Sequence, residues 1–328
     1  MAVTVRSFAK INLGLAIGAE RSDHFHSLET IYQTIALHDV IKVEAARGNG
    51  IEIRCRNPQV PCDETNTCYR VADRMLRHWK QRAKLTISIE KNLPVQGGVG
   101  AGSSNAVATM FALERELKEP LPADERLRIA AEVGSDLPLF LLGGTVLGLG
   151  RGEQIYPLDD LPAVACVLVT SPVAVSTPQA FHDWDTFMES EAKTWSLTPA
   201  NGSVTLSKFN RSAFEWLSYP NSVSGVPVEN DGDRAETPLL DLVRAGIEND
   251  FERVVFPQYP ELRDVKRVLE REGADYASLS GSGSTMYGLF RTRERAVQAA
   301  ERMSAEGLAT TVTETLPRKD YRAQMFAK

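Results

Sequence analysis

The stretch LPVQGGVGAGSSNA, at residues 93–106, is the part of the sequence that says most about the fold. Four of the six residues from Gly97 to Gly102 are glycine, so the backbone there can reach left-handed conformations that a Cβ atom would forbid. Successive N–H groups of such a turn can converge on one anion. The uncharged run from Ser103 to Leu113 predicts a buried helix, whose positive end would lie at the same place.

The turn therefore predicts a phosphate site, although two better-known phosphate motifs do not fit it. The Walker A pattern GxxxxGK[ST], begun at Gly97, meets Ser103 where the lysine belongs. The dinucleotide pattern GxGxxG, begun at Gly98, meets the same serine at its third glycine. A flexible turn without a ligand is the alternative. If phosphates do bind, the hydroxyl of Ser103 or Ser104 can help to hold a magnesium ion between them.

A second cluster of small residues, SLSGSGST at residues 278–285, lies between two strand-like segments. It is typical of a tight hairpin. Its small side chains would also let it support the first turn against the phosphates. Both interpretations stay open.

Hydrophobic periodicity predicts an α+β fold. Strands are expected at residues 3–8, 11–17, 29–37, 40–44, 51–55, 85–89, 165–170, 276–280, 285–290 and 310–314. Helices are expected at residues 66–84, 103–113, 124–133, 135–140, 260–273 and 294–306. We expect Gly134 to end one helix in the left-handed conformation and Ser135 to cap the next.

The length of 328 residues exceeds a usual domain of roughly 100 to 200 residues, so we expect two domains. Residues 1–162 would form an N-terminal domain with the glycine turn and the catalytic residues, and residues 163–328 a C-terminal α+β domain. Within the latter, residues 188–237 are rich in Ser, Asn, Pro, Gly and acidic residues. This composition predicts a long, flexible surface insertion.

Composition and charge argue against several other classes of protein. The net charge of −6 is opposite to that of a typical nucleic-acid binder. The four cysteines have no CxxC pair or zinc-ligand spacing, so we interpret them as reduced thiols. The sequence has neither a signal-peptide pattern nor a run of 18 apolar residues, which predicts a cytoplasmic protein without a membrane span.

Three segments together resemble the superfamily that contains galactokinase, homoserine kinase, mevalonate kinase and phosphomevalonate kinase. They are FAKINLGL at residues 8–15, LPVQGGVGAGSSNA at 93–106 and LSGSGSTMYGLF at 279–290. Within this superfamily, further segments are similar to the 4-diphosphocytidyl-2-C-methyl-D-erythritol kinase family. These are AKIN at residues 9–12, DHFH at 23–26, GSDLP at 134–138, STP at 176–178 and NDFE at 249–252.

The chain departs from this family at two of these segments. The family usually has Asp-Gly-Tyr-His where this sequence has Asp23, His24, Phe25 and His26, so a glycine turn has become histidine and a tyrosine has lost its hydroxyl. The family's Gly-Ala-Asp-Val-Pro is Gly-Ser-Asp-Leu-Pro at residues 134–138, which leaves the acid in place.

The resemblance implies a two-domain small-molecule kinase with ATP and Mg²⁺ as cofactors. It would transfer the γ-phosphoryl group to a hydroxyl of the methylerythritol part of its substrate. Asp136 is the candidate base, and the ammonium of Lys10 would keep it ionised and offset charge on the phosphoryl group. The alternatives are a helix cap for Asp136, a place that Ser135 can equally take, and a surface lysine for Lys10.

The resemblance also implies the binding residues. Asn12 lies on the same strand face as Lys10 and can bond the substrate, and aromatic side chains with one histidine can stack on and orient a cytosine. Core packing is the alternative for the aromatic residues, and helix capping is the alternative for Asn66. The substrate would contact Asn12, Phe25, His26, Tyr32, Thr177 and Phe181. ATP would contact Asn66, Pro94, Val95, Gln96, Gly97, Gly98, Val99, Gly100, Ala101, Gly102, Ser103 and Ser104.

Two other functions stay open at this point. Another kinase of the superfamily, acting on homoserine or phosphomevalonate, would share the three motifs without needing aromatic residues for a cytosine. A catalytically silent binding protein on the same fold would be expected to lack Lys10 or Asp136, and both are present. We expect a small-molecule substrate and a monomer or homodimer, and the sequence assigns no magnesium ligands.

Overall fold

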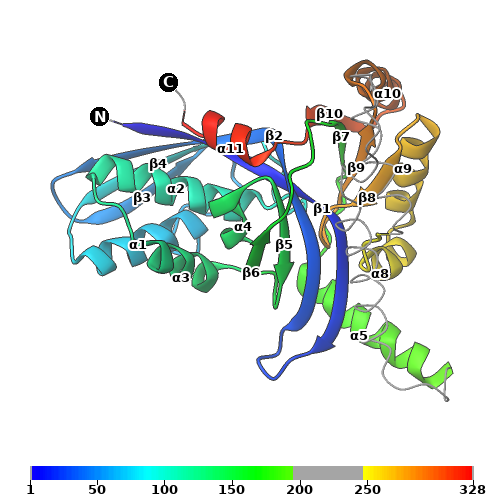
Figure 1. Ribbon diagram of the computed structural model, residues 1–328, viewed down its shortest axis with the longest axis horizontal. Helices are drawn as coiled ribbons and strands as arrows, with labels where there is room; N and C mark the ends of the chain where they lie inside the picture. The colour runs from blue at the N-terminus through cyan, green and yellow to red at the C-terminus, as the bar shows by residue number, and fades with distance from the viewer. Residues whose placement is uncertain (1, 195–246, 327–328) are drawn as a thin grey trace, which may run out of the picture.

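In the computed structural model, which describes residues 2–194 and 247–326, the chain forms two β-sheets with helices packed on them (Figure 1). This confirms the α+β class. The first sheet has six strands in the order β3-β4-β2-β5-β6, with β1 also paired to β2. Strands β3 and β4 run parallel, and the other neighbours are antiparallel. The strands are β1 (Val3–Glu20), β2 (His26–Ala46), β3 (Gly50–Cys55), β4 (Lys84–Glu90), β5 (Thr145–Leu149) and β6 (Gln154–Pro157).

Helices cover one face of this first sheet (Figure 1). They are α1 (Thr67–Trp79), α2 (Ala101–Leu117), α3 (Ala123–Val133) and α4 (Leu137–Leu142). Helix α2 packs directly on β1 and β2 and also contacts α1 and α4. Its small side chains allow this close approach on several sides, as the uncharged sequence predicted.

The second sheet has four antiparallel strands in the order β10-β7-β9-β8, with α9 and α10 packed on it. Its strands are β7 (Ala165–Thr170), β8 (Tyr276–Leu279), β9 (Thr285–Phe290) and β10 (Ala309–Glu314). The helices of this half are α5 (Thr177–Thr194), α8 (Glu252–Gln258), α9 (Pro260–Arg271), α10 (Arg293–Ala305) and α11 (Arg318–Gln324).

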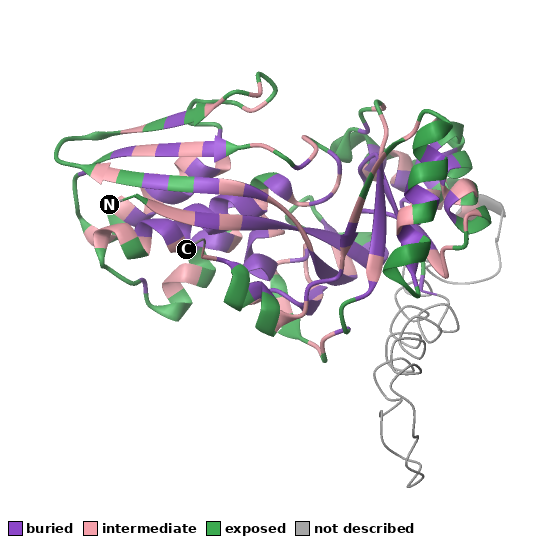
Figure 2. Cartoon of the chain, turned by 90° about the horizontal axis from the view of Figure 1, so that it is seen from above, coloured by how far each residue is buried: buried purple, intermediate pink, exposed green. Residues whose placement is uncertain are grey.

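Strand β1 contributes to the apolar cores of both halves. Val5, near its start, packs in a cluster with α1 and α2, whereas Ile17, near its end, packs with α8, α9 and α10. Ile11 lies in a third cluster, with Val99 of the glycine turn. In the burial-coloured view, purple runs along strands and helix faces that meet in the interior (Figure 2). A strand buried on both faces is a continuous apolar run rather than an alternating one.

The long strands differ from the shorter ones that we predicted. The segments at 3–8 and 11–17 form the continuous strand β1, and those at 29–37 and 40–44 form β2. Register shifts between Phe8 and Ala9 and between Asn12 and Gly14 interrupt the pairing without ending the strand. Such irregularities disturb the alternation of side chains, which is why the pattern suggested separate strands.

The helices at 103–113, 124–133, 260–273 and 294–306 are confirmed, with ends displaced by a few residues. The helix expected at 66–84 ends at Trp79, because Lys80 is left-handed and Lys84 begins β4. Gly134 has a φ of −179°, so the left-handed prediction is wrong. Ser135 does not cap α4 either, because Asp136 occupies the N-cap position.

The predicted insertion is corrected over its first residues. Residues 188–194 complete α5, so the loop prediction is wrong for them, and residues 195–237 lie outside the described residues. Helix α5 as a whole was not predicted from the sequence. Strands β5 and β6 and helices α8 and α11 were not predicted either.

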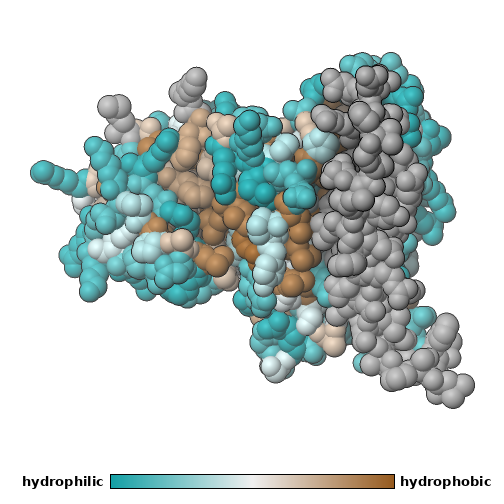
Figure 3. Space-filling view, viewed as in Figure 1, coloured by the Kyte–Doolittle hydropathy of each residue, from teal (hydrophilic) through white to brown (hydrophobic). Residues whose placement is uncertain are grey.

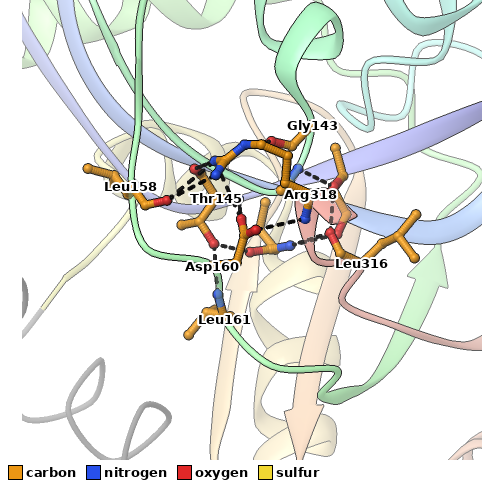
Figure 4. A network of polar contacts seen from close by, with 10 residues as sticks. Gly143, Thr145, Leu158, Asp160, Leu161, Leu316 and Arg318 are labelled. Atoms are coloured by element: carbon orange, nitrogen blue, oxygen red, sulfur yellow. Dashed lines mark hydrogen bonds and ion pairs between the residues drawn. The ribbon is translucent and has the colours of Figure 1, made fainter. Parts of the chain in front are cut away.

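Helix α11 returns from the second half to the first, where it fixes the segment after α4 (Figure 4). Arg318 donates hydrogen bonds to Gly143 O, Leu158 O and Thr145 O, and its guanidinium lies 3.4 Å from Asp160. Asp160 also accepts bonds from the backbone N–H groups of Thr145 and Arg318. The carboxyl-terminal end of α4 is therefore anchored.

Over the described residues of the face in the space-filling view, hydrophobic residues gather in a band where Figure 1 places α4 and β5, and hydrophilic residues surround this band (Figure 3). Leu141 and Leu142 of α4 are only partly buried. Within residues 2–194 and 247–326, no helix is long and apolar enough to cross a membrane.

Candidate active site

A cleft of about 950 Å³ is lined by residues from both halves of the chain. The predicted site residues come together there, except Ser104. The lining includes Lys10, Asn12, Phe25, His26, Tyr32, Asn66, residues 94–103, Asp136, Thr177 and Phe181. Segments distant in the sequence thus meet around one space of the size that small-molecule ligands occupy.

The glycine turn forms one wall of the cleft and needs glycine at two positions in particular. Gly98 and Gly100 have left-handed φ values of +78° and +70°. A Cβ atom at Gly98 would lie 2.0 Å from Ser280 O, and one at Gly100 would lie 2.9 Å from Phe140 Cζ. Gly102 differs, because it lies in the first turn of α2 and a Cβ atom there would meet only Thr67 Oγ1, at 3.7 Å.

The second small-residue cluster packs directly on this turn. It forms the β8–β9 hairpin, as expected, and a Cβ atom at Gly283 would lie 2.4 Å from Gly98 N. Thr285 N donates to Gly97 O at 3.2 Å, and Ser280 Oγ donates to Gly98 O at 3.0 Å. Both interpretations of the cluster are therefore compatible: it is a hairpin, and it supports the turn.

The two serines after the turn have different surroundings. Ser104 is buried, donates to Phe8 O at 2.6 Å and accepts a bond from Ser7 Oγ at 2.7 Å, so its hydroxyl joins α2 to β1. Ser103 lines the cleft. Among the described residues, no group of three or more His, Cys, Asp or Glu side chains is arranged to hold a metal ion.

Lys10 and Asp136 lie together in the cleft. Lys10 Nζ is 3.6 Å from Asp136 Oδ2 and donates to Asn12 Oδ1 at 2.6 Å. The Lys10 side chain is only 3% exposed, so the surface-lysine alternative is wrong. Burial lowers its pKa, and the neighbouring Asp136 carboxylate opposes that shift. Asn12 Nδ2 in turn donates to Thr30 Oγ1 at 2.8 Å, which fixes its orientation.

Asp136 holds the N-cap position of α4 but makes no capping hydrogen bond with its side chain. Its Oδ1 accepts a 3.0 Å bond from the Tyr32 hydroxyl, and its side chain is 34% exposed to the cleft. Burial, and secondarily Asp136, raises the pKa of Tyr32 well above its usual value, so the phenol stays a neutral donor. The carboxylate is thus oriented by groups from two strands while remaining open to a ligand.

His26 and Phe181 form another part of the cleft lining. Their rings stack with centroids 4.9 Å apart, and His26 Nε2 lies 2.7 Å from Asp185 Oδ1. Phe25 is 49% exposed, and the Arg151 guanidinium lies over its ring at 4.8 Å. The His26 ring already covers one face of the Phe181 ring. A cytosine ring could therefore stack directly between Phe25 and Phe181 only if it took the place of His26 on that face or if one of these side chains rotated.

Two further predicted residues have defined partners. Asn66 caps α1 by accepting a bond from Cys68 N at 2.8 Å, so the capping alternative holds while the side chain also lines the cleft. Thr177, at the start of α5, is hydrogen-bonded to Ser282 of the β8–β9 turn at 2.8 Å. Helix α5 is thereby tied to the hairpin that supports the glycine turn.

Sequence reasoning missed Arg151, Lys91 and Asp185, which also line the cleft. Lys91 is paired with buried Asp39 at 2.7 Å. A signal for Arg151 was available, because it stands between Gly150 and Gly152 in the segment GLGRGE at residues 148–153. Isolated charged residues such as Lys91 and Asp185 carried no comparable signal.

Known sequences are similar to this chain over nearly its whole length. The models of the N-terminal and C-terminal domains of GHMP kinases match residues 66–144 and 235–309. A 4-diphosphocytidyl-2-C-methyl-D-erythritol kinase of Solibacter usitatus is 34% identical over 97% of this chain and 90% of its own length. The enzyme of that name from Acaryochloris marina is 32% identical over 97% of this chain and 94% of its own length.

Solved structures agree with this similarity. A crystal structure of 4-(cytidine 5'-diphospho)-2C-methyl-D-erythritol kinase has a TM-score of 0.68 and 26% identity, covering 95% of this chain and 98% of that one. A homoserine kinase from Cytophaga hutchinsonii also has a TM-score of 0.68 but 18% identity, covering 96% of this chain and 95% of its own. The second likeness concerns the fold alone.

Proposed function

The chain belongs to the 4-diphosphocytidyl-2-C-methyl-D-erythritol kinase family of the GHMP kinases, and we propose that it phosphorylates 4-diphosphocytidyl-2-C-methyl-D-erythritol. It is an ATP-dependent small-molecule kinase. The acceptor would be a hydroxyl of the methylerythritol part, in the non-mevalonate route to isoprenoid precursors. The observation that carries this proposal is the pairing of Lys10 with Asp136 in the same cleft as the glycine turn.

In the proposed mechanism, the hydroxyl oxygen of the substrate attacks the γ-phosphorus of ATP, and ADP leaves. Asp136 accepts the proton of that hydroxyl. Tyr32 and Lys10 hold the carboxylate from two sides, which limits its rotation before the reaction. The ammonium of Lys10 also offsets negative charge on the transferring phosphoryl group. Its bond to Asn12 keeps it directed into the cleft.

The donor side fits ATP phosphates at the glycine turn. The left-handed residues Gly98 and Gly100 direct backbone groups around a concave turn beside the start of α2. Mg²⁺ would neutralise phosphate charge there, held mainly by phosphate oxygens and water, with Ser103 as the protein hydroxyl at hand. This arrangement requires no cluster of protein carboxylates.

The acceptor side fits a cytidine group. His26 has a polar edge, and its 2.7 Å contact with Asp185 fixes the ring. The stacked His26–Phe181 pair and the exposed Phe25 offer aromatic faces. Base stacking on such rings stabilises binding by roughly 1 to 3 kcal/mol per base in other proteins.

A substrate panel tests the proposal. ATP consumption would be measured in parallel with 4-diphosphocytidyl-2-C-methyl-D-erythritol, methylerythritol phosphate, homoserine and phosphomevalonate. We expect turnover of the first compound and poor turnover of the other three. Equal turnover of methylerythritol phosphate would rule out recognition of the substrate through its cytidine group. A preference for homoserine or phosphomevalonate would assign the chain to another activity of the superfamily.

Three further parts of the proposal concern the whole protein. We retain a division into residues 1–162 and 163–328, although β1 and α11 pack across it. We also infer a cytoplasmic location from the metabolic role, and a monomer or homodimer. Limited proteolysis and sedimentation would test the division and the oligomeric state.

A further inference from the structure

Arg151 is a cation at the acceptor end of the cleft that the proposed mechanism does not use. The Lys and Arg side chains that line the cleft in the described part of the chain are Lys10, Lys91 and Arg151. Lys10 donates a hydrogen bond to Asn12 and is paired with Asp136, and Lys91 is paired with Asp39. The ion pair of Arg151 with Glu153 is looser, with Nε 3.8 Å from Oε1, so its guanidinium N–H groups are available.

The local backbone fixes where Arg151 stands. Gly150 and Gly152 on either side have left-handed φ values of +73° and +98°. Gly150 O accepts a 2.7 Å bond from Leu28 N, and Arg151 N donates to Glu153 Oε2 at 2.6 Å. A Cβ atom at Gly152 would lie 2.4 Å from the Tyr32 hydroxyl and 3.9 Å from Asp136 Oδ1. The turn therefore passes directly beside the reacting end.

The Arg151 side chain reaches the other way, toward Phe25. Its guanidinium carbon lies 4.8 Å from the centre of that ring. A guanidinium stacked on an aromatic face keeps its N–H edge free to bind a second group in its own plane. The order along the cleft is thus Phe25, then Arg151, then Asp136.

The proposed substrate has the same order of chemical groups: cytidine, then diphosphate, then methylerythritol. We propose that Arg151 binds the diphosphate of the acceptor substrate, with Phe25 holding the guanidinium plane in place. This inference rests on the proposed function. The forked N–H donors of arginine can bind two oxygens of a diphosphate at once, and the hydrogen bonds between them are charge-assisted.

The test measures the binding of cytidine 5′-diphosphate and of cytidine by calorimetry, with the donor site filled by a non-hydrolysable ATP analogue. We expect the wild type to bind the diphosphate more tightly than the nucleoside, and Arg151→Gln to reduce that preference by about tenfold or more. Arg151→Lys should retain part of it, because the charge stays while the planar fork is lost. Cytidine alone should bind all three proteins similarly.

Arg21→Gln is the matched control. Arg21 is a partly buried arginine of the β1–β2 turn, which also carries Phe25; its Nε lies 3.2 Å from Asp23 Oδ1, and it does not line the cleft. Its replacement should leave the preference for the diphosphate unchanged. The inference is overturned if Arg151→Gln keeps the full preference, or if Arg21→Gln loses it equally.

The same proteins separate this inference from the proposed function. If the wild type phosphorylates 4-diphosphocytidyl-2-C-methyl-D-erythritol while Arg151→Gln retains the wild-type KM and diphosphate preference, only the role of Arg151 fails. If the wild type does not turn this compound over, both proposals fail. A raised KM for the acceptor in Arg151→Gln, with an unchanged KM for ATP, supports both.

Discussion

Asp136 illustrates how a residue can be free for chemistry although it begins a helix. A carboxylate at an N-cap usually accepts a hydrogen bond from the first helical N–H groups. Such a bond would leave the carboxylate less free to act on a substrate. Here the side chain makes no such bond and instead meets the Tyr32 hydroxyl and Lys10. The role of Asp136 as the base stays a prediction, while Ser135 is not the substitute cap that the sequence suggested.

Replacing the carboxylate tests its proposed role as base. Asp136→Asn should lower kcat by roughly 10²-fold or more, because the amide cannot accept the substrate proton. Fold and nucleotide binding should persist, since the residue makes no capping bond. Steady-state kinetics together with the affinity for a non-hydrolysable ATP analogue measure both effects, and near-normal turnover would remove Asp136 from the mechanism.

Tyr32 is expected to act through Asp136 rather than on the substrate. In Tyr32→Phe the ring still fills its buried site beside Lys10, but Asp136 loses one orienting hydrogen bond. Hydrogen bonds to charged groups contribute about 1.5 to 3 kcal/mol, so kcat should fall by roughly tenfold or more while KM for ATP stays the same.

Tyr276→Phe provides a control for the loss of a buried phenol. The Tyr276 hydroxyl lies within hydrogen-bond distance of both Leu13 O and Ile247 O, outside the cleft, so its replacement should reduce stability but not the kcat of the folded protein. Equal losses of kcat in both variants would show that the Tyr32 effect is not specific to the site.

At the scale of elements, the glycine turn depends on two kinds of constraint. Gly98 and Gly100 are required by their left-handed backbone and by contacts with Ser280 O and Phe140. Gly102 is required by neither, because it is helical and a Cβ atom there would make only an ordinary van der Waals contact with Thr67 Oγ1. A ligand is the remaining reason for a glycine at that position.

The two kinds of glycine can be separated by alanine substitution. Gly102→Ala should increase the free energy of unfolding by up to about 1 kcal/mol, because alanine favours a helix over glycine. It should nevertheless raise KM for ATP, because the added methyl group enters the cleft. Gly98→Ala should lower both stability and ATP affinity. Thermal unfolding and kinetics measure the pair, and an unchanged KM in Gly102→Ala would mean that ATP does not approach this residue.

The sequence predicted the elements that are determined by local patterns better than those that depend on contacts between distant residues. Helices α2, α3, α9 and α10 follow from periodicity and composition, and the glycine turn follows from its four glycines. Strands β5 and β6 are short, and α11 depends on Arg318 and Tyr321 contacts with residues far away in the sequence. The meeting of Lys10 with Asp136 is also non-local, so only the resemblance to a family suggested it.

At the scale of the whole molecule, two adjacent polar residues fix the hairpin of the C-terminal half and join this half to β1. Asn249 donates to Leu279 O and Gly281 O and so fixes the hairpin behind the glycine turn. Asp250 Oδ2 accepts a 2.9 Å bond from Ile17 N of β1. Strand β1 carries Lys10 at its centre, so this contact connects the C-terminal half to the strand that contributes the lysine of the proposed mechanism.

Asp250 should make the stability of the protein depend on pH. It is 4% exposed, and burial raises its pKa from 3.8 to about 6, against the opposing effects of the Ile17 N–H group and Arg253. Between these two pKa values the folded state holds a proton that the unfolded state has released. The contribution of the protonated form is therefore fully present below the unfolded pKa and is lost as pH rises through the folded pKa.

Asp250→Asn removes this titration while its amide oxygen can still accept the bond from Ile17 N. Relative to the variant, the wild type should lose up to about 3 kcal/mol of stability as pH rises from about 4 to about 7, at roughly 1.4 kcal/mol for each pKa unit. Urea unfolding of both proteins across this range measures the difference, in which other titrating groups cancel. Parallel stability curves would show that Asp250 titrates near its ordinary value, and that the contact between β1 and the C-terminal half does not bury its charge.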